Sequence, residues 1–170
     1  MAEEEGGAAE EEALATGTFI FPAGLTDKYE GQWRARPLAE GEEPEPEKDE
    51  KNAGDGDVDP GAALQGRNYV RHGKGRSEVA GAWSYDGDWS NDVMEGRGVF
   101  TYASGAAYDG EWKANAYDGV GTYVWPDKTA YTGEWKANAM HGQGVFTDKE
   151  GRQWTGAFYN NTGPGLAMIV

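Results

Sequence analysis

The chain has 170 residues, a net charge of −15 and no cysteine, which excludes disulfide-stabilised scaffolds and zinc sites built from thiolates. Leu, Ile, Val and Phe are scarce, but seven Trp, nine Tyr and five Phe supply large rings that can build a core in place of aliphatic side chains. Glycine, at 27 residues, is more than twice as frequent as in an average protein. Composition therefore predicts a folded chain with an aromatic core and a regular need for glycine.

Two acidic segments hold almost all of the net charge. Residues 1–12 contain six Glu and no basic residue, and residues 40–59 contain ten acidic residues against Lys48 and Lys51. We expect residues 1–16 and 37–61 to be disordered, because such compositions cannot bury enough apolar area to order themselves. The chain has no apolar run of about 18 residues, and its N-terminus lacks the pattern of a secretory signal, so the sequence predicts a cytoplasmic protein.

Two motifs recur with a period of 23 residues. The first is a pentad of the form Tyr-x-Gly-x-Trp, and the second is a Gly-x-Gly motif that begins eleven residues after the tyrosine wherever the unit is uninterrupted. The pentad residues are Tyr29, Gly31, Trp33, Tyr85, Gly87, Trp89, Tyr108, Gly110, Trp112, Tyr131, Gly133 and Trp135, with a degenerate copy at Trp154, Gly156 and Phe158. The paired glycines are Gly73, Gly75, Gly96, Gly98, Gly119, Gly121, Gly142 and Gly144.

Each unit has the pattern of a hairpin of two short strands. The aromatic, glycine and aromatic residues of the pentad alternate, so they share one side of a strand and leave Asp109 and Glu111 on the other. Small and polar turn residues, such as those at 113–116 and 103–105, separate the strands. The order along the chain is a half unit (17–28), an interrupted unit (29–84), three full units (85–107, 108–130, 131–153), a degenerate unit (154–165) and an apolar tail (166–170).

The pentad followed by Gly-x-Gly, as in Tyr131 to Trp135 with Gly142 and Gly144, resembles the membrane occupation and recognition nexus (MORN) repeat. The resemblance covers about residues 17–165 apart from the insertion. It implies an all-β fold, an elongated single-layer twisted antiparallel sheet made of stacked hairpins. The spacing argument predicts the same hairpins independently.

On function, a chain that is nearly all repeat most resembles the small axonemal members of the family. That resemblance implies a non-catalytic, microtubule-associated structural protein of the cilium or flagellum, with axonemal proteins as partners and tubulin among the candidates. One alternative is a peripheral membrane adaptor that binds lipid headgroups, and another is a regulatory module for an enzyme in trans.

Candidate catalytic residues are better explained by the repeat. His72 and His141 each precede a Gly-x-Gly motif at the same repeat position, so we interpret them as turn residues rather than metal ligands. The glycine pairs lack the further residues of a phosphate loop, and the acidic pairs of the pentads recur on a solvated face. The sequence predicts no enzyme activity, no cofactor and no metal site.

Two segments are candidate partner-binding surfaces. Basic residues gather on or beside the first hairpin, where they could meet an acidic partner or the chain's own acidic insertion: Lys28, Arg34, Arg36, Arg67, Arg71, Lys74 and Arg76. From Asp86 to Trp154 eleven acidic residues outnumber six basic ones, which disfavours binding to nucleic acid or anionic membranes. At the C-terminus, Leu166, Met168, Ile169 and Val170 form an apolar run that we expect to contact a partner or a second copy; the alternative is that it folds back over Trp154 and Phe158.

Overall fold

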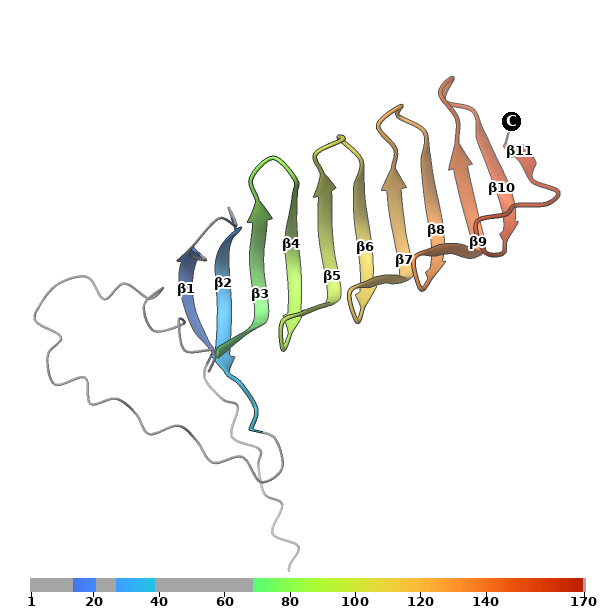
Figure 1. The fold of residues 1–170 in the computed structure, drawn as a ribbon. Helices are drawn as coiled ribbons and strands as arrows, with labels where there is room; N and C mark the ends of the chain where they lie inside the picture. The colour runs from blue at the N-terminus through green and yellow to red at the C-terminus, as the bar shows by residue number, and fades with distance from the viewer. Residues whose placement is uncertain (1–13, 21–26, 39–68, 170) are drawn as a thin grey trace, which may run out of the picture.

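The computed structural model describes residues 14–20, 27–38 and 69–169, which form one antiparallel sheet of eleven strands. The strands lie side by side in chain order, in a single layer (Figure 1). They are β1 (Ala15–Ile20), β2 (Asp27–Ala35), β3 (Tyr69–Val79), β4 (Trp83–Ser90), β5 (Val93–Tyr102), β6 (Ala107–Lys113), β7 (Ala116–Val124), β8 (Ala130–Lys136), β9 (Ala139–Thr147), β10 (Gln153–Phe158) and β11 (Ala167–Ile169). This order confirms the predicted all-β ribbon of stacked hairpins. None of the described residues belongs to a helix that is long and apolar enough to cross a membrane.

Several predictions fall outside the described residues. They concern residues 1–13, residues 39–61 of the acidic insertion, Arg67 and Val170. Ala15 and Thr16, which composition grouped with the acidic N-terminus, pair instead with β2. The two strands that flank the insertion pair with each other from Asp27↔Val79 to Ala35↔Tyr69.

The turns within the hairpins are short and left-handed. Asn91-Asp92, Ala114-Asn115, Ala137-Asn138 and Asn160-Asn161 all have positive φ, between 46° and 67°. Two consecutive residues of this conformation form a type I′ turn, whose twist matches that of the flanking strands. The local turn chemistry thus sets the hairpin register, and the turn that the sequence predicted at residues 113–116 is confirmed.

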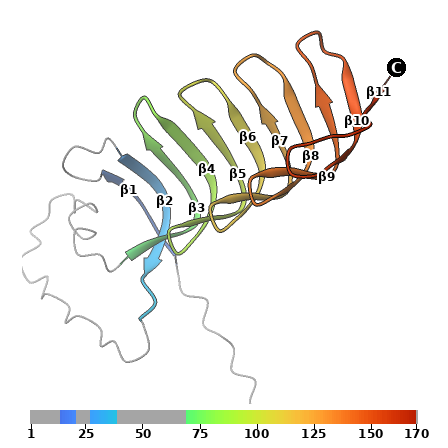
Figure 2. The ribbon, with the colours of Figure 1, turned by 45° about the vertical axis from the view of Figure 1, so that its right-hand side comes forward.

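The first glycine of each Gly-x-Gly motif lies at a β-bulge. The register shifts opposite the pentads, between Gly31/Trp33, Gly87/Trp89, Gly110/Trp112 and Gly133/Glu134. The bulge glycines have φ from 59° at Gly142 to 111° at Gly119, a region that glycine adopts without steric cost. Bulges bend strands, and Figure 2 shows a curved strip. His72 and His141 lie beside these glycines inside β3 and β9, so their interpretation as turn residues is wrong: the glycines serve a bulge within a strand, not a chain reversal.

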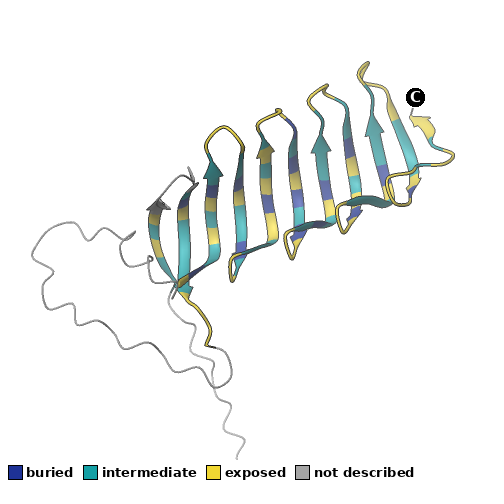
Figure 3. Cartoon of the chain, viewed as in Figure 1, coloured by how far each residue is buried: buried dark blue, intermediate teal, exposed yellow. Residues whose placement is uncertain are grey.

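The core is one face of this sheet. Tyr29, Tyr85, Tyr108 and Tyr131 are at most 1% exposed, although no second layer covers them in the described part of the chain (Figure 3). Each ring lies flat over a row of cross-strand glycine pairs. That row runs through Gly17, Gly31, Gly75, Gly87, Gly98, Gly110, Gly121, Gly133, Gly144 and Gly156.

Candidate binding surfaces

The tyrosine rings need glycine beneath them. A Cβ atom on Gly98 would lie 2.6 Å from Cε2 of Tyr85, and one on Gly121 would lie 2.6 Å from Cζ of Tyr108. Real Cβ atoms do not approach carbon that closely. The structure thus explains the regular need for glycine that composition predicts: the glycine pair of each hairpin leaves room for a tyrosine ring.

Hydrogen bonds fix the buried rings to the backbone. Each tyrosine hydroxyl donates to the carbonyl oxygen three residues later, for example from Tyr85 to Asp88 at 2.9 Å and from Tyr108 to Glu111 at 2.9 Å. In the three full units, the tryptophan Nε1 of the pentad donates to a glycine carbonyl of the preceding unit: Trp89 to Gly75, Trp112 to Gly98 and Trp135 to Gly121, at 2.8–3.0 Å. Because the polar atoms of these rings are satisfied, the rings can be buried without a desolvation penalty for unpaired groups.

Aromatic contacts join successive units. The rings of Tyr85 and Trp89 meet edge to face at 5.0 Å within one unit, and those of Tyr85 and Trp112 meet at 5.2 Å across the boundary to the next. Tyr108 and Trp135 repeat the second contact at 5.5 Å. Edge-to-face pairs are stabilising beyond the area that they bury. The ladder therefore fixes each unit against its neighbour.

Burial keeps these tyrosines protonated. Desolvation raises the pKa of Tyr29 to about 12, partly offset by the Arg71 guanidinium. Desolvation also raises the pKa of Tyr85 and of Tyr108, and the nearby carboxylates of Asp88 and Glu111 add to the effect. The hydroxyls therefore remain hydrogen-bond donors throughout the neutral range.

The acidic residue at the fourth pentad position has a structural role that the sequence analysis missed. Backbone N–H groups beside the bulge glycines donate to these side chains: Arg97 to Asp88, Val120 to Glu111 and Gln143 to Glu134, at 2.9–3.0 Å. In the first hairpin, Lys74 donates in the same way to Oε1 of Gln32 at 2.7 Å. The interpretation of these acids as merely solvated is therefore wrong for the fourth position, because they satisfy the backbone that each bulge leaves unpaired.

Each turn is fastened to the hairpin before it. The side-chain oxygen of the second turn residue accepts a hydrogen bond from a strand N–H 21 residues earlier, at 2.8–3.0 Å; the pairs are Asp92 with Arg71, Asn115 with Met94, Asn138 with Tyr117 and Asn161 with Met140. The N–H of the same turn residue donates back to the carbonyl of the same partner at 3.0–3.1 Å. Asn and Asp suit this position because they tolerate positive φ and carry an acceptor.

Half-buried rings line the margin of the aromatic face. Trp83 and Phe100 stack at 5.3 Å, and Trp125 contacts Phe146 at 6.1 Å. These rings pack against the buried cluster but remain partly accessible. They form the aromatic margin, the first surface on which a partner could bury apolar area.

The opposite, outer face differs between its two halves. Over β2–β6 it carries ion pairs. Lys28 with Glu30 and Arg76 with Glu78 pair along one strand, both at 3.1 Å, whereas Lys74 with Asp88 and Arg97 with Glu111, the latter at 3.7 Å, pair across strands. Over β7–β11 two continuous rows carry no charge. They are Thr122–Thr132–Val145–Thr155–Ala167 and Val124–Ala130–Thr147–Gln153–Ile169, which we call the uncharged outer rows.

The predicted basic residues of the first hairpin are engaged with neighbouring side chains. Besides the ion pairs of Lys28, Lys74 and Arg76, the Arg71 guanidinium bonds Asp92 at 2.9 Å and stacks 4.0 Å from the centroid of the Trp89 ring. Arg34 donates to Oδ1 of Asn91 at 3.0 Å.

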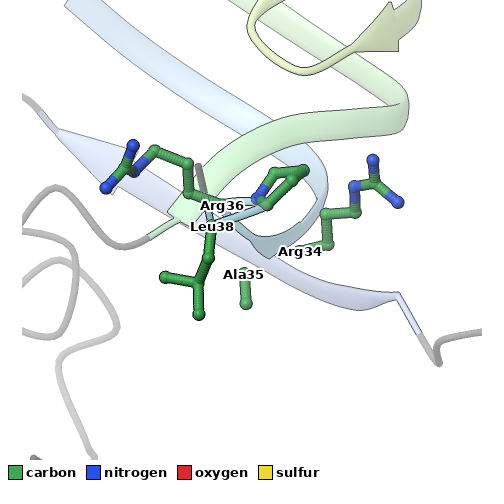
Figure 4. A pocket seen from close by; sticks show the side chains of 5 residues that line it. Arg34, Ala35, Arg36 and Leu38 are labelled. Carbon is green, nitrogen blue, oxygen red and sulfur yellow. The ribbon is translucent and has the colours of Figure 1, made fainter. Parts of the chain in front are cut away.

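A shallow hollow of about 490 Å³ lies beside this hairpin. It is lined by Arg34, Ala35, Arg36, Pro37 and Leu38. The side chains of Arg34 and Arg36 point to opposite sides of the segment instead of converging on a common point (Figure 4). The hollow therefore does not assemble the convergent polar groups of a small-molecule site.

The two histidines, which the sequence analysis did not assign as metal ligands, are far apart in the sheet. His72 and His141 lie in β3 and β9, with five strands between them in the sheet. Among the described residues, no group of three or more His, Cys, Asp or Glu side chains is arranged to hold a metal ion.

The apolar C-terminal run is part of the sheet. β11 pairs with β10 through Gln153↔Ile169, Trp154↔Met168 and Thr155↔Ala167, and Leu166 packs against the core beside Phe158. Leu166 thus folds back over the last unit, as the alternative interpretation had it, whereas Met168 and Ile169 remain 49% and 46% exposed.

Comparison with family models identifies the MORN repeat at residues 85–107, 108–130 and 131–151. The first two segments coincide with the units that the sequence period predicts, and each segment contains one pentad strand and one Gly-x-Gly strand. No curated protein matches the chain. Residues 85–151 are therefore three consecutive MORN repeats.

Proposed function

We propose that the chain is a cytoplasmic, non-catalytic scaffold whose ribbon of MORN repeats binds proteins of a larger assembly, the axoneme of a cilium or flagellum. The observation that carries the proposal is that the recurring acids hold the fold. Asp88, Glu111 and Glu134 are hydrogen-bonded to backbone at the bulges, so the groups that acid–base chemistry would need are committed to structure.

Two surfaces support protein binding by such a scaffold. The aromatic margin offers large, rigid rings, the side chains that contribute most per residue to protein interfaces. The uncharged outer rows offer a flat area from which no ion has to be desolvated. Axonemal proteins, with tubulin as one candidate, are the proposed partners, and the axonemal placement rests on the resemblance to small chains made almost wholly of repeats.

The experiment that tests this placement is fractionation of ciliated cells expressing a tagged full-length chain. We expect the chain to remain with axonemes after extraction with detergent and then with about 0.5 M salt, a concentration that screens surface charge within a few ångströms. A Trp83→Ala/Phe100→Ala variant should be released, because it removes rings from the aromatic margin. Release of the unaltered chain by detergent alone would contradict the proposal.

Vesicle binding separates the scaffold from a membrane adaptor. The ion pairs of Lys28, Arg71 and Arg76 with neighbouring acids leave less positive charge to attract anionic lipid. We expect no co-sedimentation of the chain with phosphatidylserine vesicles at low salt. Appreciable binding would favour the membrane adaptor.

A further inference from the structure

The C-terminal edge of the sheet is a short apolar strand. Monomeric proteins usually protect an edge strand by keeping it very short or with charges, prolines or bulges. β11 is short, at three residues, but it contains no charge, proline or bulge, and Met168 and Ile169 on it are 49% and 46% exposed. The 18 residues after Arg152 contain no charged side chain, and the uncharged outer rows end at Ala167 and Ile169. No strand of the described residues pairs with the other side of β11, so its backbone groups there are available to another strand.

The strand order decides how a second copy can add to this edge. Every neighbouring pair in the sheet is antiparallel and the strands number eleven, so β1 and β11 run in the same direction (Figure 1). Head-to-tail stacking of two ribbons would place β11 beside β1 of the next copy as a parallel pair. A two-fold axis at β11 instead gives an antiparallel pair, the arrangement found everywhere else in this sheet.

Charge also favours pairing of two copies at β11 over pairing at β1. Residues 1–12, which precede β1 in the sequence, contain six Glu, so pairing two copies at β1 would bring like charges together. Pairing at β11 brings no charged side chains together, because no side chain after Arg152 is charged.

We propose that the C-terminal edge binds a second copy of this chain, with the two β11 strands paired antiparallel about a two-fold axis at Met168. Met168 is the central residue of β11 and pairs with Trp154. In the dimer it lies opposite its own counterpart on the aromatic face, while Ala167 lies opposite Ile169 of the other copy on the outer face. Three residues a side make a small interface, so the dimer is weak and forms at about 100 µM or above.

Sedimentation equilibrium of the full chain from about 5 to 500 µM tests the dimer, over the range in which weak complexes dissociate. We expect a monomer–dimer equilibrium for the unaltered chain and monomers for Met168→Lys and for Met168→Glu, because each places like charges opposite one another. An equimolar mixture of these two variants should dimerise again. Val120→Lys, on the outer face of β7 and away from the edge, is the matched control and should dimerise like the unaltered chain. Circular dichroism checks that each variant is folded, and Ile169→Lys, at the other exposed position of the strand, serves if Met168 variants unfold.

Cross-linking tests the register without adding charge. The chain contains no cysteine, so Met168→Cys introduces a single thiol. Residues opposite each other in an antiparallel pair have Cβ atoms about 5 Å apart, within reach of a disulfide after small adjustment. Under mild oxidation we expect covalent dimers of Met168→Cys to form about 100-fold faster than those of Val120→Cys, because pairing raises the effective thiol concentration into the millimolar range.

Three outcomes would overturn the proposal. The first is a chain that stays monomeric at every concentration. The second is a dimer that persists in both charged variants at Met168. The third is equal cross-linking rates at positions 168 and 120.

Discussion

The glycine row is the feature of this ribbon least tolerant of substitution. Gly98→Ala would push a methyl group against the Tyr85 ring, which is fully buried. We expect a loss of about 2–3 kcal/mol in the free energy of unfolding, the range for overpacked cores. Gly105→Ala is the control: its φ is 84° but nothing lies within 4 Å of the new atom, so we expect only about 1 kcal/mol from backbone strain. Urea unfolding measures both, and equal losses would argue against the close ring-to-glycine contact.

The acids at the fourth pentad position accept hydrogen bonds from the bulge backbone, a capping role that predicts graded losses of stability for variants of Glu111. Glu111→Ala removes the acceptor for the Val120 N–H at the bulge, and we expect it to cost about 1 kcal/mol, since the site is partly exposed. Glu111→Gln should cost less than half of that, because Gln32 performs the same role in the first hairpin. Asp109→Ala, on the same face but exposed, should change stability by no more than about 0.5 kcal/mol. Chemical denaturation of the three variants would contradict the capping role if Glu111→Ala and Asp109→Ala were alike.

The buried hydroxyls predict how the ribbon responds to alkali. Burial raises the pKa of Tyr29 to about 12 and that of Tyr85, Tyr108 and Tyr131 above the ordinary value. The folded chain then holds these protons more tightly than the unfolded chain, whose tyrosines ionise near pH 10. Stability should therefore be insensitive to these groups below about pH 10 and should fall as the pH rises toward 12.

Tyrosinate absorbance and far-ultraviolet circular dichroism, recorded together against pH, check this expectation. The buried tyrosines should ionise as the sheet unfolds. Tyr108→Phe is the matched variant: it loses one hydrogen bond at neutral pH, but its stability should fall less steeply in alkali because one ionisable group is gone. Ionisation of most tyrosines from an intact sheet would show that the rings are not buried in solution.

Among the strands and turns, local rules explain what the sequence predicted. Alternation along the pentad placed Tyr108 and Trp112 on one face, and Asn or Asp in the second turn position marked the chain reversals. Both signals are local, because a strand has a period of two and a type I′ turn occupies two residues. The exact 23-residue repeat then extended them along the array.

The bulges were not predicted because they couple residues on two different strands, which the alternation along a single strand does not relate. The signal was present: the fourth pentad position holds Gln32, Asp88, Glu111 or Glu134, always with an acceptor oxygen, whereas the second position varies to threonine. In the last unit this position is Ala157, and the pairing of β10 with β11 from Gln153↔Ile169 to Thr155↔Ala167 contains no register shift. The acceptor at the fourth pentad position, taken together with the first glycine of the following Gly-x-Gly motif, would have predicted the hydrogen bond at the bulge.

The hydrogen bonds between each turn and the preceding hairpin predict different effects for two variants of the same turn residue. Asn138→Gly keeps the left-handed turn but removes the acceptor for the Tyr117 N–H, so we expect a loss of about 1 kcal/mol in the free energy of unfolding. Asn138→Asp keeps an acceptor, as Asp92 does in another turn, and should be nearly neutral. Thermal and urea unfolding compare the two, and indistinguishable variants would mean that the turns are independent of each other.

At the scale of the whole molecule, contacts between neighbouring strands and units hold the described ribbon together. Each strand pairs with the strand before and the strand after, and the tryptophan hydrogen bonds reach back by a single unit. Such an array has stability that is approximately a sum over units and their interfaces. Length can then change without changing the fold, provided that the register survives.

Removing one period should therefore leave a shorter but intact ribbon. Deleting residues 98–120 joins Arg97 to Gly121 and restores a Gly-x-Gly strand, so that Gly87 can pair with Gly121 and the Trp135 indole keeps its bond to the Gly121 carbonyl. We expect one cooperative unfolding transition at a lower urea midpoint, because an interface has been lost. Deleting residues 98–119 leaves a single extra residue in that strand, which turns Tyr123 and its neighbours to the opposite face and should abolish the cooperative transition. Tryptophan fluorescence during urea unfolding distinguishes the two chains; if both unfold alike, the period of 23 residues does not set the register, and the glycine row must be specified in some other way.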